Sequence, residues 1–359
     1  MKIISFLFLF YQFSFSQIFQ IDTITFEEIR KNLFYTKIRI NDLHNVNVLQ
    51  IDPTFFTFET FRPNLLQTTS EQIKLNNNFP DIVAAINGDF FSFETGWPLN
   101  PQISNKIPVL LSSSNKHQII FSDAKLPKIA SIEFNGEIIT SDTIINFTNV
   151  NGNKFSKSIS FHNNYSNNNR IDSTCKIIYL NQINTSNNFA DTLYFTISNF
   201  SENILSIPNN IFDVLKNKFV DTIKIFHSIK PEIKNINNLI SGTGLLLANN
   251  SFDSTIWYEK EKVSKSFVHT NHPRTVFAIN KNLNLIYFIV VDGRQQTSTG
   301  MTFYQLIDFL KYYKITDALN LDGGGSSTLL IDGIIKNSPS DILGERKVAN
   351  SILLVQRKN

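Results

Sequence analysis

The chain has 359 residues, with 33 Lys and Arg residues against 30 Asp and Glu residues. This near balance excludes the strong single-sign field that favours nucleic acid or an acidic surface as a partner, and the length suits one large domain or two small ones. A single cysteine, Cys175, excludes an intramolecular disulfide framework, so a hydrophobic core must hold the fold together.

The first 16 residues have the pattern of a secretory signal peptide. Lys2 precedes an apolar run over residues 3–15, and Ser14 and Ser16 are the small residues expected before a cleavage site. The run is shorter than the about 20 apolar residues of a membrane span, and no cysteine follows it to carry a lipoprotein anchor. We therefore expect a secreted or periplasmic protein that begins at Gln17 and has no stable membrane insertion after cleavage.

Short strands and one polar strand end are predicted in the first hundred residues. Apolar and polar residues alternate at 35–40 and at 46–51, which is typical of strands, and residues 69–76 favour a short helix. The apolar segment 81–86 predicts a buried strand that runs directly into Asn87-Gly88-Asp89. Polar side chains therefore follow abruptly where a buried strand ends.

The middle of the chain, about 100–235, indicates a β-rich region with few catalytic groups. Strand patterns occur at 131–134 and 192–197, and residues 207–218 favour a short helix. Asn135-Gly136 lies between alternating segments and predicts a hairpin turn. We place this region inside one domain that spans residues 17–359.

The C-terminal part combines strands with a helix. An apolar strand at 285–291 ends at Asp292, Thr302 is a candidate N-cap for a helix that extends to Leu310, and a strand at 318–321 follows. Asp332-Gly333 predicts a hairpin, and residues 351–355 predict a last strand. Together these elements predict an α+β fold, with a mixed, strand-rich sheet and a few helices, including one strand–helix–strand unit near the C-terminus.

A carboxylate followed by three glycines is the most distinctive stretch of the chain. Asp322 precedes Gly323, Gly324 and Gly325, and Ser326 comes next. Consecutive glycines let a ligand approach the main chain closely, and their N–H groups can converge on an anion. A carboxylate at such a turn is a candidate acid, base or nucleophile. A tight turn before the following hairpin would explain the glycines alone equally well.

Asp292 and Asp322 would lie at one sheet edge if the strands before them are parallel. Open α/β sheets bind their ligands at that edge. Neighbouring and next-nearest strands lie about 4.8 Å and about 9.6 Å apart, which brackets the carboxylate separations of retaining (about 5–5.5 Å) and inverting (about 6.5–9.5 Å) glycosidases. The sequence thus permits a carboxylate pair and leaves the stereochemical course open. A simple Asp-Gly turn is the alternative for Asp292.

Three further polar positions each allow a functional and a structural interpretation. Arg274 follows a proline, and a guanidinium held in this way suits bidentate binding of phosphate or carboxylate, or else a structural salt bridge. His272 is a candidate general acid, although a histidine before proline is more often structural. Glu345-Arg346 is more often surface charge or support for other site residues than a catalytic pair.

We expect no metal and no cofactor. The six histidines are scattered and the cysteine is isolated, so no metal-ligand cluster has convincing spacing. The glycine stretch lacks the lysine and spacing of a P-loop and also lacks the G-x-G-x-x-G pattern of a dinucleotide site.

Five motifs, in this order along the chain, resemble those of the phosphodiester glycosidase family. They are Ala85-Ile86-Asn87-Gly88-Asp89-Phe90-Phe91, His272-Pro273-Arg274-Thr275, Val291-Asp292-Gly293, Gly300-Met301-Thr302 and Asn320-Leu321-Asp322-Gly323-Gly324-Gly325-Ser326-Ser327. The resemblance covers about 80–100 and 240–356 and leaves the middle unmatched. Asp89 departs from the glycine that the family often carries, and the added carboxylate would alter either the substrate or only the turn.

The resemblance implies hydrolysis of a GlcNAc-1-phosphodiester-like substrate to free sugar and a phosphomonoester, in carbohydrate or exopolysaccharide metabolism. It implies that Asp322 acts at the anomeric carbon or on its attacking water, with Asp292 as a partner carboxylate or a contact of the sugar hydroxyls. The residues expected to bind the substrate are Arg274, Asn87, Gly88, Asp89, Asn320, Gly323, Gly324, Gly325 and Ser326.

Two other functions fit the same residues. One is a non-catalytic binding protein for cell-surface or exopolysaccharide glycopolymers, and the other is an exopolysaccharide-processing enzyme that cuts a different bond. Asp322 together with Arg274 favours an enzyme, because recognition alone seldom needs a carboxylate facing an anionic ligand.

Overall fold

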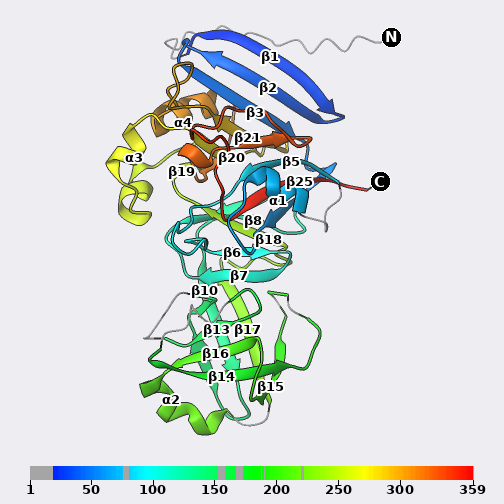
Figure 1. Ribbon diagram of the computed structural model, residues 1–359, viewed down its shortest axis with the longest axis vertical. Coiled ribbons are helices and arrows are strands. Elements are labelled where there is room, and N and C mark those ends of the chain that lie inside the picture. Colours follow the sequence, from blue (N-terminus) through cyan, green and yellow to red (C-terminus); the bar gives the residue numbers. More distant parts are fainter. Residues whose placement is uncertain are drawn as a thin grey trace.

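The computed structural model describes residues 19–75, 81–152, 158–166, 173–186, 188–189, 191–219 and 222–358. The predicted signal peptide at 1–16 and the expected new N-terminus at Gln17 lie outside these residues. Within them, no helix combines the length and the apolar character that crossing a membrane requires. The molecule is elongated, with the N-terminal strands at one end and the middle of the sequence at the other (Figure 1).

Three sheets contain the strands of the described residues. In spatial order, the seven-stranded sheet consists of β1 (Ile21–Arg30), β2 (Leu33–Ile40), β3 (His44–Ile51), β21 (Leu285–Val291), β20 (Arg274–Asn280), β22 (Asp317–Asn320) and β19 (Leu245–Leu247). The five-stranded sheet consists, in the same way, of β24 (Ile334–Ile335), β23 (Leu329–Ile331), β5 (Ile82–Asn87), β25 (Ser351–Gln356) and β4 (Phe56–Phe61).

The largest sheet contains most of the middle of the chain. Its thirteen strands, again in spatial order, are β11 (Ile144–Phe147), β10 (Glu133–Ile139), β17 (Thr222–Lys230), β15 (Leu193–Ser198), β14 (Cys175–Gln182), β16 (Asn203–Pro208), β13 (Ser160–His162), β12 (Asn149–Val150), β7 (Ile107–Ser112), β6 (Gln102–Ser104), β18 (Asn238–Gly242), β8 (His117–Phe121) and β9 (Lys128–Ala130). The α-helices of the described residues are α1 (Thr69–Leu75), α2 (Asn209–Leu215), α3 (Lys265–His269) and α4 (Phe303–Tyr312). Single turns of other helix types occur at Lys216–Lys218, Ile256–Lys260 and Gly324–Ser326.

The predicted α+β class is wrong, because the fold is mostly β. Apart from the parallel pair β12–β13, the paired strands of the described chain are antiparallel, and the longest α-helix there, α4, has 10 residues. The reason lies in the alternation of the strands. In β4, Phe56, Phe58 and Thr60 are buried while the residues between them are half-buried, so sheets can cover one another without a layer of helices.

The strand–helix–strand unit near the C-terminus is present inside this β fold. β20 lies between β21 and β22 and is antiparallel to both, so β21 and β22 run in the same direction. α4 connects them, and its N-cap is a capping box in which the Thr302 hydroxyl and the Gln305 side chain each bond the other residue's backbone N–H. Asp292 and Asp322 therefore follow two strands that end at the same edge of the sheet.

Alternate residues of β20 serve two hydrophobic cores. Phe277 packs in the cluster between the seven-stranded and five-stranded sheets, together with Ile352 of β25. Val276 packs in the cluster on the other face, together with Leu306 of α4. A third cluster lies among the strands of the thirteen-stranded sheet and contains Phe161 of β13. β20 is buried along its whole length, so it fixes the position of the strand ends that carry the candidate site.

The predicted hairpin turn at Asn135-Gly136 is wrong. Both residues lie inside β10, which pairs with β11 and β17 on its two sides. A Cβ at Gly136 would lie 2.4 Å from the Phe147 ring, so the glycine makes room for an aromatic side chain rather than for a turn. The hairpin predicted at Asp332-Gly333 is confirmed, since it joins β23 to β24.

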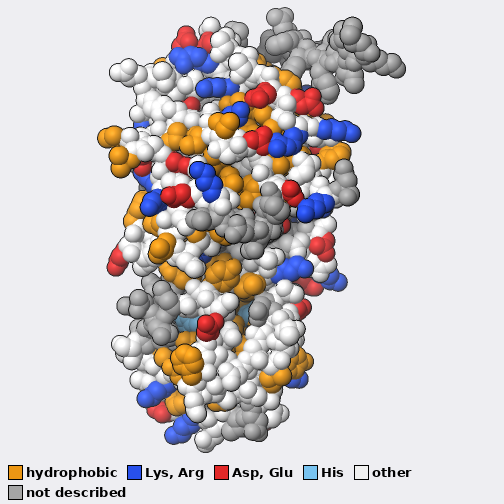
Figure 2. All heavy atoms as spheres, turned by 45° about the vertical axis from the view of Figure 1, so that its right-hand side comes forward, with side chains coloured by type: hydrophobic (Ala, Val, Ile, Leu, Met, Phe, Trp, Pro, Cys, Tyr) orange, Lys and Arg blue, Asp and Glu red, His pale blue; other side chains and the backbone are white. Residues whose placement is uncertain are grey.

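Charged side chains of both signs are intermixed on the face shown in Figure 2. The mixture fits the small formal net charge of +3.

Candidate functional site

The loops that follow β5 and β22 lie against each other. The Asn87 side-chain amide donates a hydrogen bond of 2.7 Å to the Asp322 carbonyl oxygen, and the Asp322 N–H donates one of 3.0 Å to the Gly88 carbonyl oxygen. The Asn87 side-chain oxygen accepts bonds from the Thr275 hydroxyl and the Thr328 N–H. Asn87 is fully buried, and its hydrogen bonds connect β5 of the five-stranded sheet to β20 of the seven-stranded sheet.

Asn320 and Gly88 also serve this junction. Asn320 is fully buried, and its amide donates to the Thr243 and Leu321 carbonyl oxygens. A Cβ at Gly88 would lie 2.2 Å from the side-chain oxygen of Asn350, and that oxygen accepts the Asp89 N–H. These contacts hold the loop ends in place; they do not offer Asn87 or Asn320 as surface groups for a sugar.

Asp89 and Asp322 are two neighbouring carboxyl groups at the junction, since the Asp322 N–H bonds the carbonyl oxygen of Gly88, the residue before Asp89. Burial raises the pKa of Asp89 to about 7, and the nearby Asp322 charge adds to this shift while Asn100 and Lys116 oppose it. Burial also raises the pKa of Asp322 to about 6, against the opposing effects of Ser326, the Gly323 N–H and Arg346. Two neighbouring carboxyls with raised pKa values can hold one proton and one negative charge near neutral pH.

The three glycines make room for groups that pack onto the loop. A Cβ at Gly323 would lie 2.8 Å from the Pro273 carbonyl oxygen, and one at Gly324 would lie 3.1 Å from the Arg294 guanidinium. Gly324 also has a φ of 62°, which favours glycine. A Cβ at Gly325 would lie 2.1 Å from Asp341 Oδ1 and 2.3 Å from Arg346 Nη2. The loop surface is therefore lined by two arginines.

Most N–H groups of this loop are engaged within the protein. Gly323 donates to its neighbour's carboxylate, Asp322 Oδ1, and Gly324 donates to the Pro273 carbonyl oxygen. Ser326 and Ser327 donate to the Gly323 and Gly324 carbonyl oxygens. An anion at this loop would therefore be held mainly by side chains, not by a set of converging N–H groups.

Arg294 and Arg346 are the cations beside the loop. Arg294 is exposed, follows the Asp292-Gly293 turn after β21, and has one guanidinium nitrogen 3.5 Å from His272 Nδ1. Arg346 is held by a bidentate pair of bonds of 2.7 and 2.9 Å to Asp341. Its guanidinium also lies 5.6 Å from the ring centre of the exposed Phe93. Planar guanidinium groups suit the oxygens of a phosphate.

Arg274 occupies a different environment from the one expected of a phosphate ligand. Its side chain is 0% exposed, lies between the Phe267 and Phe303 rings, and donates to the carbonyl oxygens of Met301, Phe267 and Thr270. Burial lowers the pKa of Arg274 to about 9, and the nearby charge of Arg294 adds to this effect. These contacts tie α3 and the segment before α4 to the start of β20.

Asp292 is buried behind the edge of the sheet and is 1% exposed. Its Oδ1 accepts the Ser338 N–H at 2.9 Å and the Asn47 amide at 3.4 Å, and its carbonyl oxygen accepts the Ser298 hydroxyl. Burial raises the pKa of Asp292 to about 6. The groups that shift the pKa of Asp292 and those that shift the pKa of Asp322 are different. The contacts of Asp292 fix the turn that carries Arg294.

Lys116 and His272 complete the surroundings of the pair. Lys116 donates to the Glu261 carbonyl oxygen and lies close enough to Asp89 to lower the pKa of that carboxyl. Burial lowers the pKa of the half-buried His272, and the charges of Arg274 and Arg294 add to this effect. Within the described ranges, no group of three or more His, Cys, Asp or Glu side chains is placed to hold a metal ion.

The sequence did not single out Arg294 or Lys116 as candidates, and it gave Arg346 only a supporting role. Arg294 directly follows the Asp292-Gly293 turn, so its place at the carboxyl end of an apolar strand was the available signal. Lys116 had no such signal, because it lies in the region 100–235 that the sequence indicates to have few catalytic groups.

Three comparisons bear on this arrangement. Residues 183–355 match the family model described as phosphodiester glycosidase. Over 75 residues the chain is 35% identical to the mouse protein N-acetylglucosamine-1-phosphodiester alpha-N-acetylglucosaminidase, and this alignment covers 21% of the chain and 14% of the mouse protein. The match to the family model starts inside the middle region and leaves out residues 80–100.

Two solved structures share the fold. A hypothetical protein from Synechocystis matches with a TM-score of 0.70 and 17% identity, over 93% of this chain and 64% of that one. A protein from Burkholderia pseudomallei K96243 matches with a TM-score of 0.65 and 16% identity, over 90% of this chain and 77% of that one.

Proposed function

The chain belongs, through residues 183–355, to the phosphodiester glycosidase family that its motifs predicted, and we propose that it hydrolyses a sugar-1-phosphodiester. The products would be free sugar and a phosphomonoester, with a GlcNAc-1-phosphodiester as the first substrate to test. The observation that supports this most is the presence of two carboxyl groups with raised pKa values, Asp89 and Asp322, beside a loop onto which Arg294 and Arg346 pack. The predicted signal peptide supports action outside the cytoplasm, on a secreted or periplasmic substrate.

We assign the reaction to residues at the loop junction. Arg294 and Arg346 would hold the phosphodiester oxygens. Asp322, ionised above about pH 6, would attack the anomeric carbon or activate the water that does so. Asp89 would stay protonated below about pH 7 and would donate a hydrogen bond. A neutral Asp89 also avoids the electrostatic repulsion that a second carboxylate would exert on the anionic substrate.

Asp292 and Arg274 keep supporting positions in this proposal. The contacts of Asp292 fix the turn that carries Arg294, and those of Arg274 fix α3 and the chain before β20. Phosphate is a good leaving group that needs little protonation, so one ionised carboxylate with a neutral partner suffices for the reaction.

A panel of sugar phosphodiesters tests the proposal directly. The chain is incubated with UDP-GlcNAc and GlcNAc-1-phospho-mannoside, and the products are identified by mass spectrometry. Free sugar with the matching phosphomonoester supports the hydrolase. Saturable binding without any product would instead indicate the non-catalytic glycopolymer-binding protein, and another product would indicate an enzyme that cuts a different bond.

The rate should depend on pH in a bell shape with its maximum between about 6 and about 7. Below this range Asp322 takes up a proton, and above it Asp89 loses its proton and adds a negative charge. Asp89→Asn, which cannot ionise, should remove the fall on the alkaline side and keep the fall on the acidic side. A kcat/KM profile measured from about pH 4 to 9 checks this, and an unchanged alkaline limb in the variant would contradict the role of Asp89.

Gly325→Ala should raise KM about tenfold while the protein stays folded. The added methyl group would displace the Asp341–Arg346 pair, which lies 2.1 to 2.3 Å from the new Cβ. Gly333→Ala is the matched control, because Gly333 has a φ of 74° and open space around its Cβ position. The control should lose about 1 kcal/mol of stability and keep its KM. Equal KM values for Gly325→Ala and the parent would remove Arg346 from the site.

A further inference from the structure

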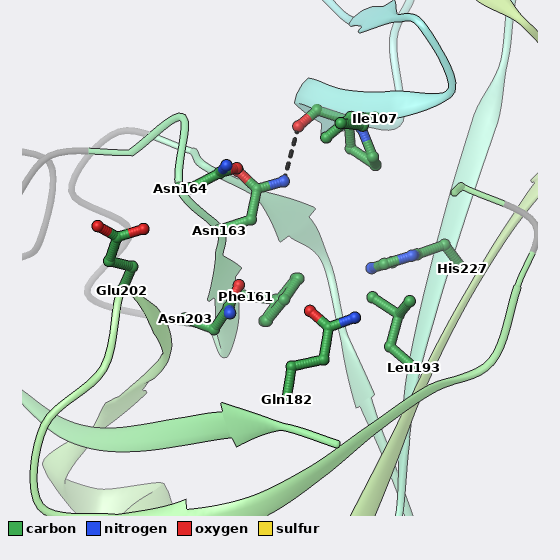
Figure 3. A pocket seen from close by; sticks show the side chains of 10 residues that line it. Ile107, Phe161, Asn163, Asn164, Gln182, Leu193, Glu202, Asn203 and His227 are labelled. Atoms are coloured by element: carbon green, nitrogen blue, oxygen red, sulfur yellow. Dashed lines mark hydrogen bonds between the residues drawn. The ribbon is translucent and has the colours of Figure 1, made fainter. Parts of the chain in front are cut away.

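A cavity of about 200 Å³ lies among strands of the thirteen-stranded sheet, and no residue of the glycine loop lines it. It is bordered by β7, β13, β14, β15, β16 and β17, which contribute Pro108, Phe161, Gln182, Leu193, Asn203 and His227 (Figure 3). Its wall mixes apolar residues with polar ones: Phe161, Leu193 and His227 are buried, Gln182 and Asn203 are half-buried, and Asn164 and Glu202 at the rim are exposed. The space is far larger than one water needs.

His227 is the unexplained residue of this cavity. It is 2% exposed and lies among the rings of Phe134, Phe147, Phe161 and Phe189, whose centres are 5.7 to 6.2 Å from its own. Within the described part of the chain, neither of its ring nitrogens has a hydrogen-bond partner. Figure 3 shows the ring pointing into the cavity. A buried polar group without a partner lowers stability, and a phenylalanine would pack in this aromatic cluster without that loss.

The ring is neutral at physiological pH. Burial lowers the pKa of His227 to about 4, and the Phe189 backbone, which lies near the ring without completing a hydrogen bond of normal geometry, opposes this shift. A neutral imidazole has one N–H donor and one acceptor nitrogen, which is the combination that a hydroxyl group needs. A charged imidazolium, which would attract an anion, does not form there at this pH.

The other polar groups also match an uncharged, hydroxyl-rich ligand. No Lys or Arg is among the residues that line the cavity, and Glu202 is the carboxylate at the rim. The Gln182 amide nitrogen donates to the Ser186 carbonyl oxygen, which leaves the Gln182 side-chain oxygen as an acceptor. Asn163 is engaged with Pro108 and Asn151 and shapes the wall (Figure 3). Phe161 and Leu193 offer an apolar surface to the non-polar face of a ring.

We propose that this cavity binds one uncharged sugar unit, with a hydroxyl or acetamido group on His227, at a site separate from the glycine loop. The cavity is smaller than the pockets of drug-sized ligands, which restricts it to a single unit or the end of a glycan. The inference rests on the cavity and its lining and does not depend on the proposed hydrolysis. It gives the middle region a role in carbohydrate binding.

Histidine resonances can locate the binding. The full chain is labelled with ¹⁵N-histidine, and the His227 imidazole signal is assigned by its loss in His227→Phe. Methyl glycosides of glucose, galactose, mannose and N-acetylglucosamine are then added at up to about 10 mM. We expect one of them to shift the His227 signal saturably.

Two variants and a control sharpen the test. His227→Phe should weaken the binding of that sugar at least tenfold by calorimetry without lowering Tm, because the aromatic cluster stays filled and the unpaired nitrogens are gone. Leu193→Trp, which narrows the cavity, should weaken it similarly. His269→Phe, on the exposed side of α3, should leave it unchanged.

Three results would overturn the proposal. They are no shift of His227 with any of the sugars, a shift confined to His272 beside the glycine loop, and a shift of His227 by a small cationic amine such as ethanolamine but by no sugar.

Discussion

Asp322→Asn is expected to lower kcat at least about a hundredfold with little change in Tm. The variant keeps an oxygen that can accept the Gly323 N–H, which is bonded at 2.9 Å to Asp322 Oδ1, so the loop should keep its shape. It loses the negative charge that the proposal places at the anomeric carbon or its water. Steady-state kinetics with the best substrate of the panel, together with a thermal melt, checks both statements.

Asp332→Asn is the matched control for this variant. Asp332 also precedes a glycine, but it lies in the hairpin between β23 and β24 and pairs with Arg30 on the surface. An exposed ion pair contributes little to stability, so kcat and Tm should both stay near their parent values. Full turnover by Asp322→Asn would remove Asp322 from the chemistry.

Arg294→Ala should lower kcat/KM about tenfold to a hundredfold, mainly through KM, because hydrogen bonds to charged groups contribute about 1.5–3 kcal/mol. The guanidinium lies 3.1 Å from the Cβ position of Gly324, beside the loop where the phosphate would bind. Arg294→Lys should keep part of the affinity, since it keeps the charge but not the planar pair of donors. Inorganic phosphate should inhibit competitively, and its inhibition should be strongest for the parent, weaker for Arg294→Lys and weakest for Arg294→Ala.

Arg30→Ala serves as the control for Arg294. Arg30 forms an exposed ion pair with Asp332 in the β23–β24 hairpin and makes no contact with the glycine loop in this pair. The control should leave KM and phosphate inhibition unchanged. If Arg294→Ala leaves both unchanged as well, the phosphate must bind elsewhere.

The sequence allowed the strand ends to be predicted better than the fold class. The apolar segments before Asn87 and Asp322 are the buried strands β5 and β22. Each is too short for a stable helix and is soon followed by glycine, so a buried strand was the expected structure. The class was wrong because pairing is non-local. Nothing near Leu285 indicates that β21 pairs with β3, more than 200 residues earlier, as well as with β20.

The positively charged side of the site shows the same limit. Arg274 has the sequence context of a ligand, yet the packing of Phe267 and Phe303 on both sides of it places it in the core. Arg294 lacked that context, and the turn after β21 places it on the glycine loop. Local pattern indicates which residues could bind an anion, and tertiary packing decides which of them lie beside the glycine loop.

Asp89 turned out to be the informative departure from the family motif. From the sequence, the carboxylate in place of the usual glycine was open to two interpretations, a changed substrate or only a changed turn. In the structure Asp89 is buried next to Gly88, whose carbonyl oxygen accepts the N–H of the half-buried Asp322. Burial raises the pKa of Asp89, and the Asp322 charge adds to this shift. We therefore predict that chains with glycine at this position have a rate profile without the alkaline limb.

The position of bond cleavage tests the central claim most directly. Hydrolysis is carried out in ¹⁸O-labelled water, and the sugar and the phosphomonoester are weighed by mass spectrometry. Attack at the anomeric carbon, as proposed for the Asp89–Asp322 pair, puts the label in the free sugar and none in the phosphate. Label in the phosphomonoester would mean that water attacks phosphorus, and the assignment of this site as a glycosidase would be contradicted.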